Sequence, residues 1–72
     1  MNELALLSTV ALMAEVPEKG LHRGQVGTVV EVLAPGVYEV EFSDDAGRAY
    51  ASLAIPAKDL LALLHEPEYR AA

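Results

Sequence analysis

The segment from residue 25 to residue 42 has the clearest hydrophobic pattern in the chain. Its first half has two alternating rows, Val26, Thr28, Val30 and Val32 on one side and Gln25, Gly27, Val29 and Glu31 on the other. Its second half separates into an apolar row, Tyr38, Val40 and Phe42, and an opposite row, Val37, Glu39 and Glu41. Alternation with period two, together with many β-branched residues, predicts two strands, the second with one solvent-facing side.

Pro35 and Gly36 separate these two strands. Proline presets φ for the second position of a turn, and glycine accepts the positive φ that a type II turn requires next, so we expect an antiparallel hairpin. Gly24 and Gly27 lie where the chain enters the first strand, and we expect them to allow positive φ or a close approach of the backbone. No helical pattern follows Gly27, which argues against a phosphate-binding loop.

The chain before the hairpin is predicted to contain one strand and one loop. Residues from about Thr9 to Ala14 are interpreted as a strand, because a hairpin needs further strands to be stable, although their Ala and Leu content also fits a helix. The leucines upstream would then pack across the barrel or against a partner: Leu4, Leu6 and Leu7. Residues 15–23 combine proline, glycine and mixed charge, which predicts a surface loop that Leu21 anchors to the core.

The chain after the hairpin is predicted to add a turn and a fourth strand. Two Asp side chains can cap a turn over residues 43–47, and Gly47 can supply its positive φ. A strand over residues 48–55 follows. One of its faces is formed by Ala49, Ala51, Leu53 and Ile55, and the other by Arg48, Tyr50 and Ser52.

The end of the chain is predicted to hold one 3₁₀ turn, over residues 56–59, and a last short strand, over residues 60–64. A short helix over residues 57–64 is the competing interpretation. The fold class is therefore all-β, a single domain of five strands that spans residues 1–64. Residues 65–72 are polar and contain a proline, so we expect a flexible tail.

Composition limits the possible functions. A chain of 72 residues forms one small domain, and 53% apolar residues is more than such a domain can easily bury, so we expect some apolar surface to belong to a partner or to a second copy. The formal net charge of −6 disfavours binding to nucleic acid and to anionic membranes. The apolar stretch near the N-terminus is too short to span a bilayer, and the chain has no cysteine, so we expect a cytoplasmic protein.

The candidate chemistry is sparse. No serine lies near a histidine in the sequence, and His22 and His65 fall in a loop and in the tail, so we expect no enzymatic activity and no catalytic residues. Possible metal ligands occur only in pairs, such as His22 with Glu18, so we expect no metal and no cofactor. If a binding face exists, we place it on six exposed polar residues: Glu39, Glu41, Asp44, Asp45, Arg48 and Tyr50.

Two short segments resemble those of SH3 domains. Ala11-Leu12-Met13-Ala14-Glu15 falls where SH3 domains carry Ala-Leu-Tyr-Asp-Tyr, and Ile55-Pro56-Ala57-Lys58-Asp59-Leu60 resembles their Ile-Pro-Ser-Asn-Tyr-Val. The resemblance implies a small five-stranded SH3-like barrel with a 3₁₀ turn before the last strand. Met13, Glu15 and Asp59 replace the tyrosines that bind proline-rich peptides, and the chain has no tryptophan, so we do not expect it to bind such peptides.

Two further resemblances concern the middle of the chain. Gly24-Gln25-Val26-Gly27-Thr28-Val29 is similar to the core of the KOW motif, whose SH3-like domains bind RNA or other proteins. The most extensive resemblance, over about residues 9–64, is to a family of short bacterial proteins catalogued as domain of unknown function 4926. Its pattern is met by Val10 to Leu12, Pro17 to Val32, Tyr38 to Phe42 and Gly47 to Ala51. It implies an SH3-like fold and a bacterial source, with no established activity.

The small size, apolar excess and acidic charge together favour a noncatalytic protein-protein interaction module. Its partner would be another protein, and the acidic charge favours a basic one; its role would be accessory or regulatory, for example that of an antitoxin-like neutraliser. A KOW-type RNA-binding module and a self-assembling structural domain, a homodimer in its simplest form, are the alternatives.

Overall fold

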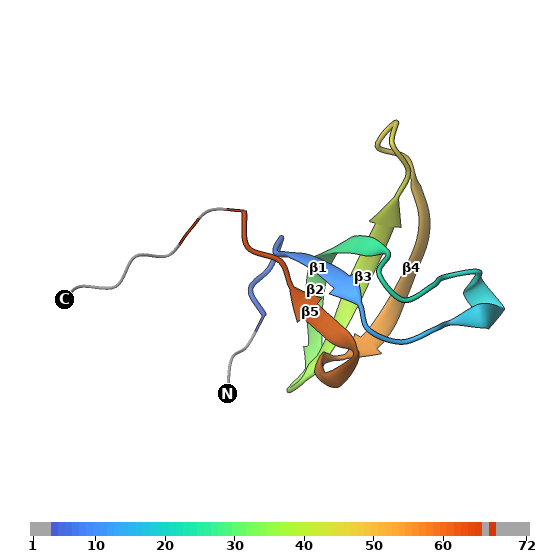
Figure 1. The fold of residues 1–72 in the computed structure, drawn as a ribbon. Coiled ribbons are helices and arrows are strands. Elements are labelled where there is room, and N and C mark those ends of the chain that lie inside the picture. Colours follow the sequence, from blue (N-terminus) through green and yellow to red (C-terminus); the bar gives the residue numbers. More distant parts are fainter. Residues whose placement is uncertain (1–3, 66, 68–72) are drawn as a thin grey trace.

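The computed structural model describes residues 4–65 and residue 67. It contains five strands: β1 (Thr9–Leu12), β2 (Val26–Ala34), β3 (Val37–Ser43), β4 (Ala49–Pro56) and β5 (Leu60–Ala62). Two 3₁₀ turns interrupt the strands: η1 (Pro17–Lys19) and η2 (Ala57–Asp59). All strand pairs are antiparallel and form one sheet in the order β4-β3-β2-β1-β5 (Figure 1). The predicted all-β class, with a 3₁₀ turn before the last of five strands, is confirmed.

Several strands end earlier or later than predicted. The strand expected over Thr9 to Ala14 stops at Leu12, where the chain bends into the long loop. The last strand is a strand and not a helix, but it ends at Ala62. The predicted flexible tail, residues 65–72, lies outside the described residues except for His65 and Pro67. Because the five strands and the position of η2 before the last of them match the expected ground plan, the fold is compatible with an SH3-like arrangement.

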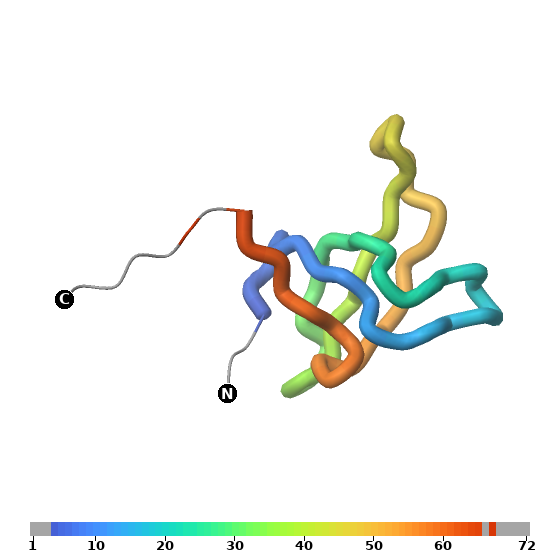
Figure 2. The backbone as a smooth tube through the Cα atoms, viewed as in Figure 1, coloured from blue at the N-terminus to red at the C-terminus, as the bar shows by residue number. Residues whose placement is uncertain are grey.

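The loop between β1 and β2, residues 13–25, is more ordered than its composition predicts. It contains η1, which begins at Pro17 and ends at Lys19, followed by Gly20, whose φ is 69°. Val16 and Leu21 form an isolated bridge at its base, and the Leu21 side chain is fully buried, which confirms it as the anchor. Figure 2 shows this loop and the β3–β4 hairpin projecting from the body of the sheet in different directions.

The turns on either side of β3 have the backbone geometry that their residues predict. Gly36 has a φ of 76° between β2 and β3, as the predicted Pro35–Gly36 turn requires. Gly47 has a φ of 82° between β3 and β4, where the Oδ1 atom of Asp44 accepts hydrogen bonds from the Ala46 and Arg48 amides at 2.9 and 3.0 Å. The predicted Asp capping of this turn is therefore confirmed.

A β-bulge in β2 breaks the alternation expected from the sequence. Val29 lies opposite Val40, but the next pair is Glu31 with Glu39, so Val30 has no partner of its own. The extra residue exchanges the two faces of the strand beyond this point. Val32, expected on the side of Val26 and Thr28, therefore lies opposite the buried Tyr38, and that part of the predicted row is wrong.

The core lies on the inner face of the sheet. It comprises Val10, Leu12, Leu21, Val29, Tyr38, Val40, Phe42, Ile55 and Leu60. Leu4 packs against it, and its amide donates to the Tyr38 hydroxyl at 3.1 Å, whereas Leu6 and Leu7 remain exposed. Of the leucines near the N-terminus, only Leu4 therefore packs internally in the way that the sequence suggested.

The two glycines before β2 meet different demands. Gly24 has a φ of 96°, in the left-handed region that other residues rarely adopt. Gly27 lies within β2 and is buried: a Cβ atom there would come within 2.7 Å of Val40 Cγ1 and 2.9 Å of the Phe42 ring. Gly24 is therefore needed for the turn, and Gly27 for close packing inside the sheet.

Candidate binding surfaces

The six residues predicted to form a binding face all come from β3, β4 and the turn between them. Glu39 and Glu41 lie on the outer face of β3 and are half-buried. Ser52, on β4, donates its hydroxyl hydrogen to Oε2 of Glu39 at 2.7 Å, and its Cα lies opposite that of Glu41. These two carboxylates form an acidic strip on the outer face, partly paired within the chain.

Asp44, Asp45 and Arg48 lie in the β3–β4 turn. Asp44 caps the turn through Oδ1, and its Oδ2 atom is 3.7 Å from Nε of Arg48. The Arg48 side chain is 83% exposed, so this ion pair contributes little to stability. Asp44 thus has a structural role, whereas Asp45 and Arg48 present their charges to solvent.

Tyr50 lies at a second bulge and faces the long loop instead of the acidic strip. Ala51 lies opposite Phe42 and Ala49 opposite Ser43, which leaves Tyr50 as the extra residue in β4. Its ring is half-exposed, and its hydroxyl accepts a hydrogen bond from Nε2 of Gln25 at 2.9 Å. The six predicted residues therefore share one hairpin but form three separate groups.

A hydrogen-bonded network in the loop was not found by the sequence analysis. Oε1 of Glu15 lies 2.9 Å from Nδ1 of His22, and Oε2 accepts a bond from the Arg23 amide at 2.9 Å. The Arg23 amide first, and the His22 ring second, lower the pKa of the Glu15 carboxyl below its ordinary value of 4.5. The His22 amide in turn donates to Gln25, so the network links the loop to Tyr50.

An exposed apolar row crosses the outer face of the other half of the sheet. Ala11, on β1, lies directly opposite Val26 of β2 on one side and Leu61 of β5 on the other. Val26 is 50% exposed and Leu61 is 51% exposed. We call these three residues the outer apolar row. The sequence analysis did not identify this row, because its three residues belong to three different strands.

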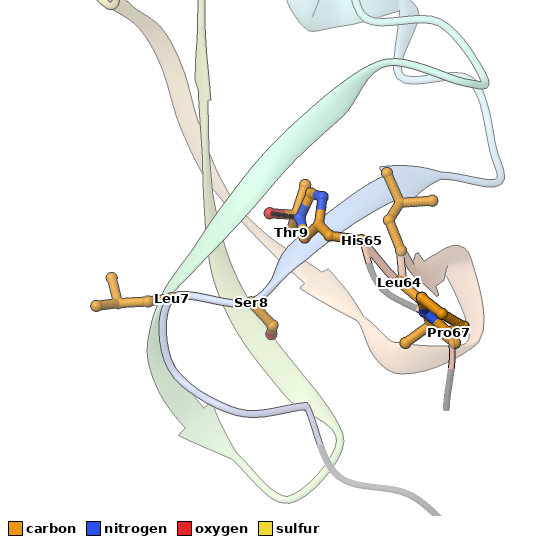
Figure 3. Close-up of a pocket in the computed structure, with 7 residues that line it drawn as sticks. Leu7, Ser8, Thr9, Leu64, His65 and Pro67 are labelled. Atoms are coloured by element: carbon orange, nitrogen blue, oxygen red, sulfur yellow. Dashed lines mark hydrogen bonds between the residues drawn. The ribbon is translucent and has the colours of Figure 1, made fainter. Parts of the chain in front are cut away.

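A groove lies at the end of the molecule where the two terminal segments meet. Leu7, Ser8 and Thr9 line it from one segment and Leu63, Leu64, His65 and Pro67 from the other, and its volume is about 530 Å³. Figure 3 shows the His65 ring beside Thr9, with Nε2 of His65 3.2 Å from the threonine hydroxyl, while Leu7 lies to one side of this pair and Leu64 to the other. The groove is therefore lined by exposed leucines and by a polar pair that is already in contact within the chain.

The described residues contain few groups of side chains that could bind a metal ion or take part in a reaction. No three His, Asp or Glu side chains among residues 4–65 and 67 are grouped to hold a metal ion. The stretch Gly24 to Val29, which resembles a KOW motif, forms the turn into β2 and the first residues of that strand, and its Gly27 and Val29 are buried. Across the described part of the chain, no helix has the length and apolar character needed to cross a membrane.

The comparisons with known proteins identify a family and no activity. The family model described as domain of unknown function (DUF4926) matches residues 6–62, and the chain belongs to that family. No curated protein matches the chain. No solved structure matches it either. The match covers all five strands, so the outer face described above is part of the family's domain.

Proposed function

We propose that the protein is a noncatalytic protein-binding module that acts as an accessory or regulatory partner of another cytoplasmic protein. The observation that carries this proposal is the distribution of large apolar side chains: nine hydrophobic residues form the buried core, while ten large ones remain exposed in the described part of the chain. Exposed apolar surface that borders polar residues is typical of protein interaction sites.

The outer face of the sheet has the composition of such a site. Residues two positions apart on a strand lie on the same face, so the outer apolar row has a parallel neighbour two residues earlier on β1 and two residues later on β2. That neighbouring row is polar and consists, in register, of Thr9, Thr28, Glu41 and Ser52. An apolar centre beside a polar, acidic rim resembles the anatomy of protein interfaces.

The charge of the chain favours a basic partner. The formal net charge is −6, and Glu39, Glu41 and Asp45 carry part of it along the β3–β4 hairpin beside the apolar row. Complementary charge accelerates encounter and disfavours acidic partners. A partner that inserts apolar side chains over Val26 and Leu61 and places Lys or Arg near Glu41 would satisfy both halves of the face. Neutralisation of a basic protein, as an antitoxin does, is one role of this kind.

The test is native mass spectrometry of the tagged chain recovered gently from its own cells. We expect a defined complex with a second, basic protein, and we expect Val26→Thr with Leu61→Thr to abolish it. The matched control is Val32→Thr with Leu33→Thr, which removes two apolar side chains of similar exposure from the other end of β2. Equal capture by both double variants would show that the outer apolar row is not the binding site, and no complex at all would remove the proposal.

A further inference from the structure

The sheet has two free edges, and they differ greatly. The strand order places β4 at one edge and β5 at the other. β5 has three residues, whereas β4 has eight, Ala49–Pro56. Within the described residues, the β4 backbone pairs with β3 alone. Every second N–H and C=O group along an edge strand points away from its own sheet, so β4 presents unpaired backbone groups to solvent.

Natural proteins protect such edges with charged side chains, prolines and bulges. β4 has no charged residue between Arg48 and Lys58, its proline is its last residue, and its bulge at Tyr50 lies near its start. The stretch from Ala51 to Ile55 between these features is regular, uncharged and free of proline. The usual devices that prevent strand addition are therefore absent from the middle of this edge.

We infer that β4 pairs with β4 of a second copy of this chain, antiparallel, to join two sheets into one across a two-fold axis. The charges at the two ends of the strand do not oppose this occupant. The turn before β4 carries Asp44, Asp45 and Arg48, with Arg48 next to the strand and 3.7 Å from Asp44, so its net charge is −1. Lys58 lies just after β4, 3.3 Å from Asp59, so that end has no net charge. Antiparallel pairing places these two ends side by side, twice by symmetry, without bringing net like charges together.

Side-chain size agrees with the same arrangement. In antiparallel pairing across a perpendicular two-fold axis, the outer faces of both copies lie on the same side of the joined sheet, and opposed residues share a face. The outer positions in the middle of β4 are Ser52 and Ala54, both exposed and small. β4 contains no acidic residue that could face the same strand of the second copy. Glu39 and Glu41 lie on β3, one strand further from the edge. This inference does not depend on the proposed function, since the outer apolar row lies on β5, β1 and β2.

Single-cysteine variants provide a clean test because the chain has no cysteine. We expect Ser52→Cys to form a covalent dimer with a short bis-maleimide at micromolar protein concentration. Thr28→Cys is the control, since Thr28 lies on the same outer face but two strands inside the edge, about 10 Å further from it. Cross-linking of Ser52→Cys alone supports the edge pair; equal cross-linking of both variants, or of neither, overturns it.

Sedimentation equilibrium of the unmodified chain gives the second measurement. We expect a concentration-dependent mass that reaches twice the monomer value, and we expect Ser52→Lys to raise the dissociation constant about tenfold or more, because like charges then meet across the axis. Thr28→Lys adds the same charge away from the edge and should leave the constant unchanged.

Lys58→Glu should weaken the dimer, and Asp45→Lys in the same chain should restore it. A strictly monomeric chain, or a dimer insensitive to these changes, contradicts the inference even if partner capture succeeds.

Discussion

The two faces of the same strands follow different rules. On the inner face, Val10, Val29, Val40 and Phe42 are fully buried. Position 27 requires glycine, because a Cβ atom there would come within 2.7 Å of Val40 and 2.9 Å of Phe42. On the outer face, apolar and polar rows lie next to each other, and Val26 and Leu61 keep half of their surface exposed. Apolar residues on the inner face are explained by folding. Those on the outer face are not, and this difference is the strongest indication of a binding role.

Removing the largest fully buried side chain should have the largest effect. Phe42 is fully buried near the end of β3, and Phe42→Ala should lower the free energy of unfolding by about 3–5 kcal/mol through lost burial and a residual cavity. Since a domain of this size has only about 5–10 kcal/mol to lose, a large fraction of the variant should be unfolded near body temperature. Urea denaturation followed by circular dichroism measures the change, and a loss below about 1 kcal/mol would mean that the inner face is not the core.

Filling the space at Gly27 should be the next most damaging change. Gly27→Val adds a side chain whose first atom already lies 2.7 Å from Val40, so we expect a loss of about 1–3 kcal/mol by overpacking. The sequence allowed either a positive φ or a close approach of the backbone at Gly27; its φ is not in the left-handed region, so the cause is steric. Thr28→Val, one residue along on the outer face, is the control and should change stability by less than about 0.5 kcal/mol.

Replacing the outer apolar row should separate binding from stability. Threonine has the β-branched shape that suits a strand, so Val26→Thr with Leu61→Thr should change the free energy of unfolding by less than about 1 kcal/mol in total. Partner capture should nevertheless be lost. The comparison between the two faces fails if this double variant unfolds as readily as Phe42→Ala, because the row would then belong to the core.

The sequence predicts the architecture well because local patterns determine it. Alternation identifies β3, and Pro35, Gly36 and Gly47 identify the turns, since few other residues adopt their φ values. The bulges at Val30 and Tyr50 could not be predicted, because a bulge depends on how two strands pair and leaves no fixed residue signature. Without them, the side of the sheet that Val32 and Tyr50 face could not be assigned.

The binding surfaces are harder to predict than the strands for a related reason. The six candidate residues are close together in the sequence. The structure places all of them on the β3–β4 hairpin but divides them into three separate groups. The outer apolar row combines three strands that are distant in sequence, so only the register of β1 with β2 and with β5 brings Ala11, Val26 and Leu61 together. An apolar residue on a strand does not by itself indicate which face it occupies.

The smallest expected effect concerns Glu15, outside both faces. The Arg23 amide and the His22 ring stabilise its carboxylate and lower its pKa in the folded chain, so the stabilisation is present above the unfolded value of 4.5 and is lost as pH falls through the lower folded pKa. Glu15→Gln removes this charge. Thermal unfolding of the variant should therefore depend less on pH below 4.5 than that of the unmodified chain.

Hydrogen exchange locates the same effect in the loop. The Arg23 amide donates to Glu15 and should exchange faster in Glu15→Gln, because an amide oxygen is a weaker acceptor than a carboxylate. Glu18→Gln removes the same charge from the same loop without touching this bond, and Arg23 should keep its protection there. If both variants expose Arg23 equally, the total charge of the loop, and not the contact with Glu15, protects the Arg23 amide.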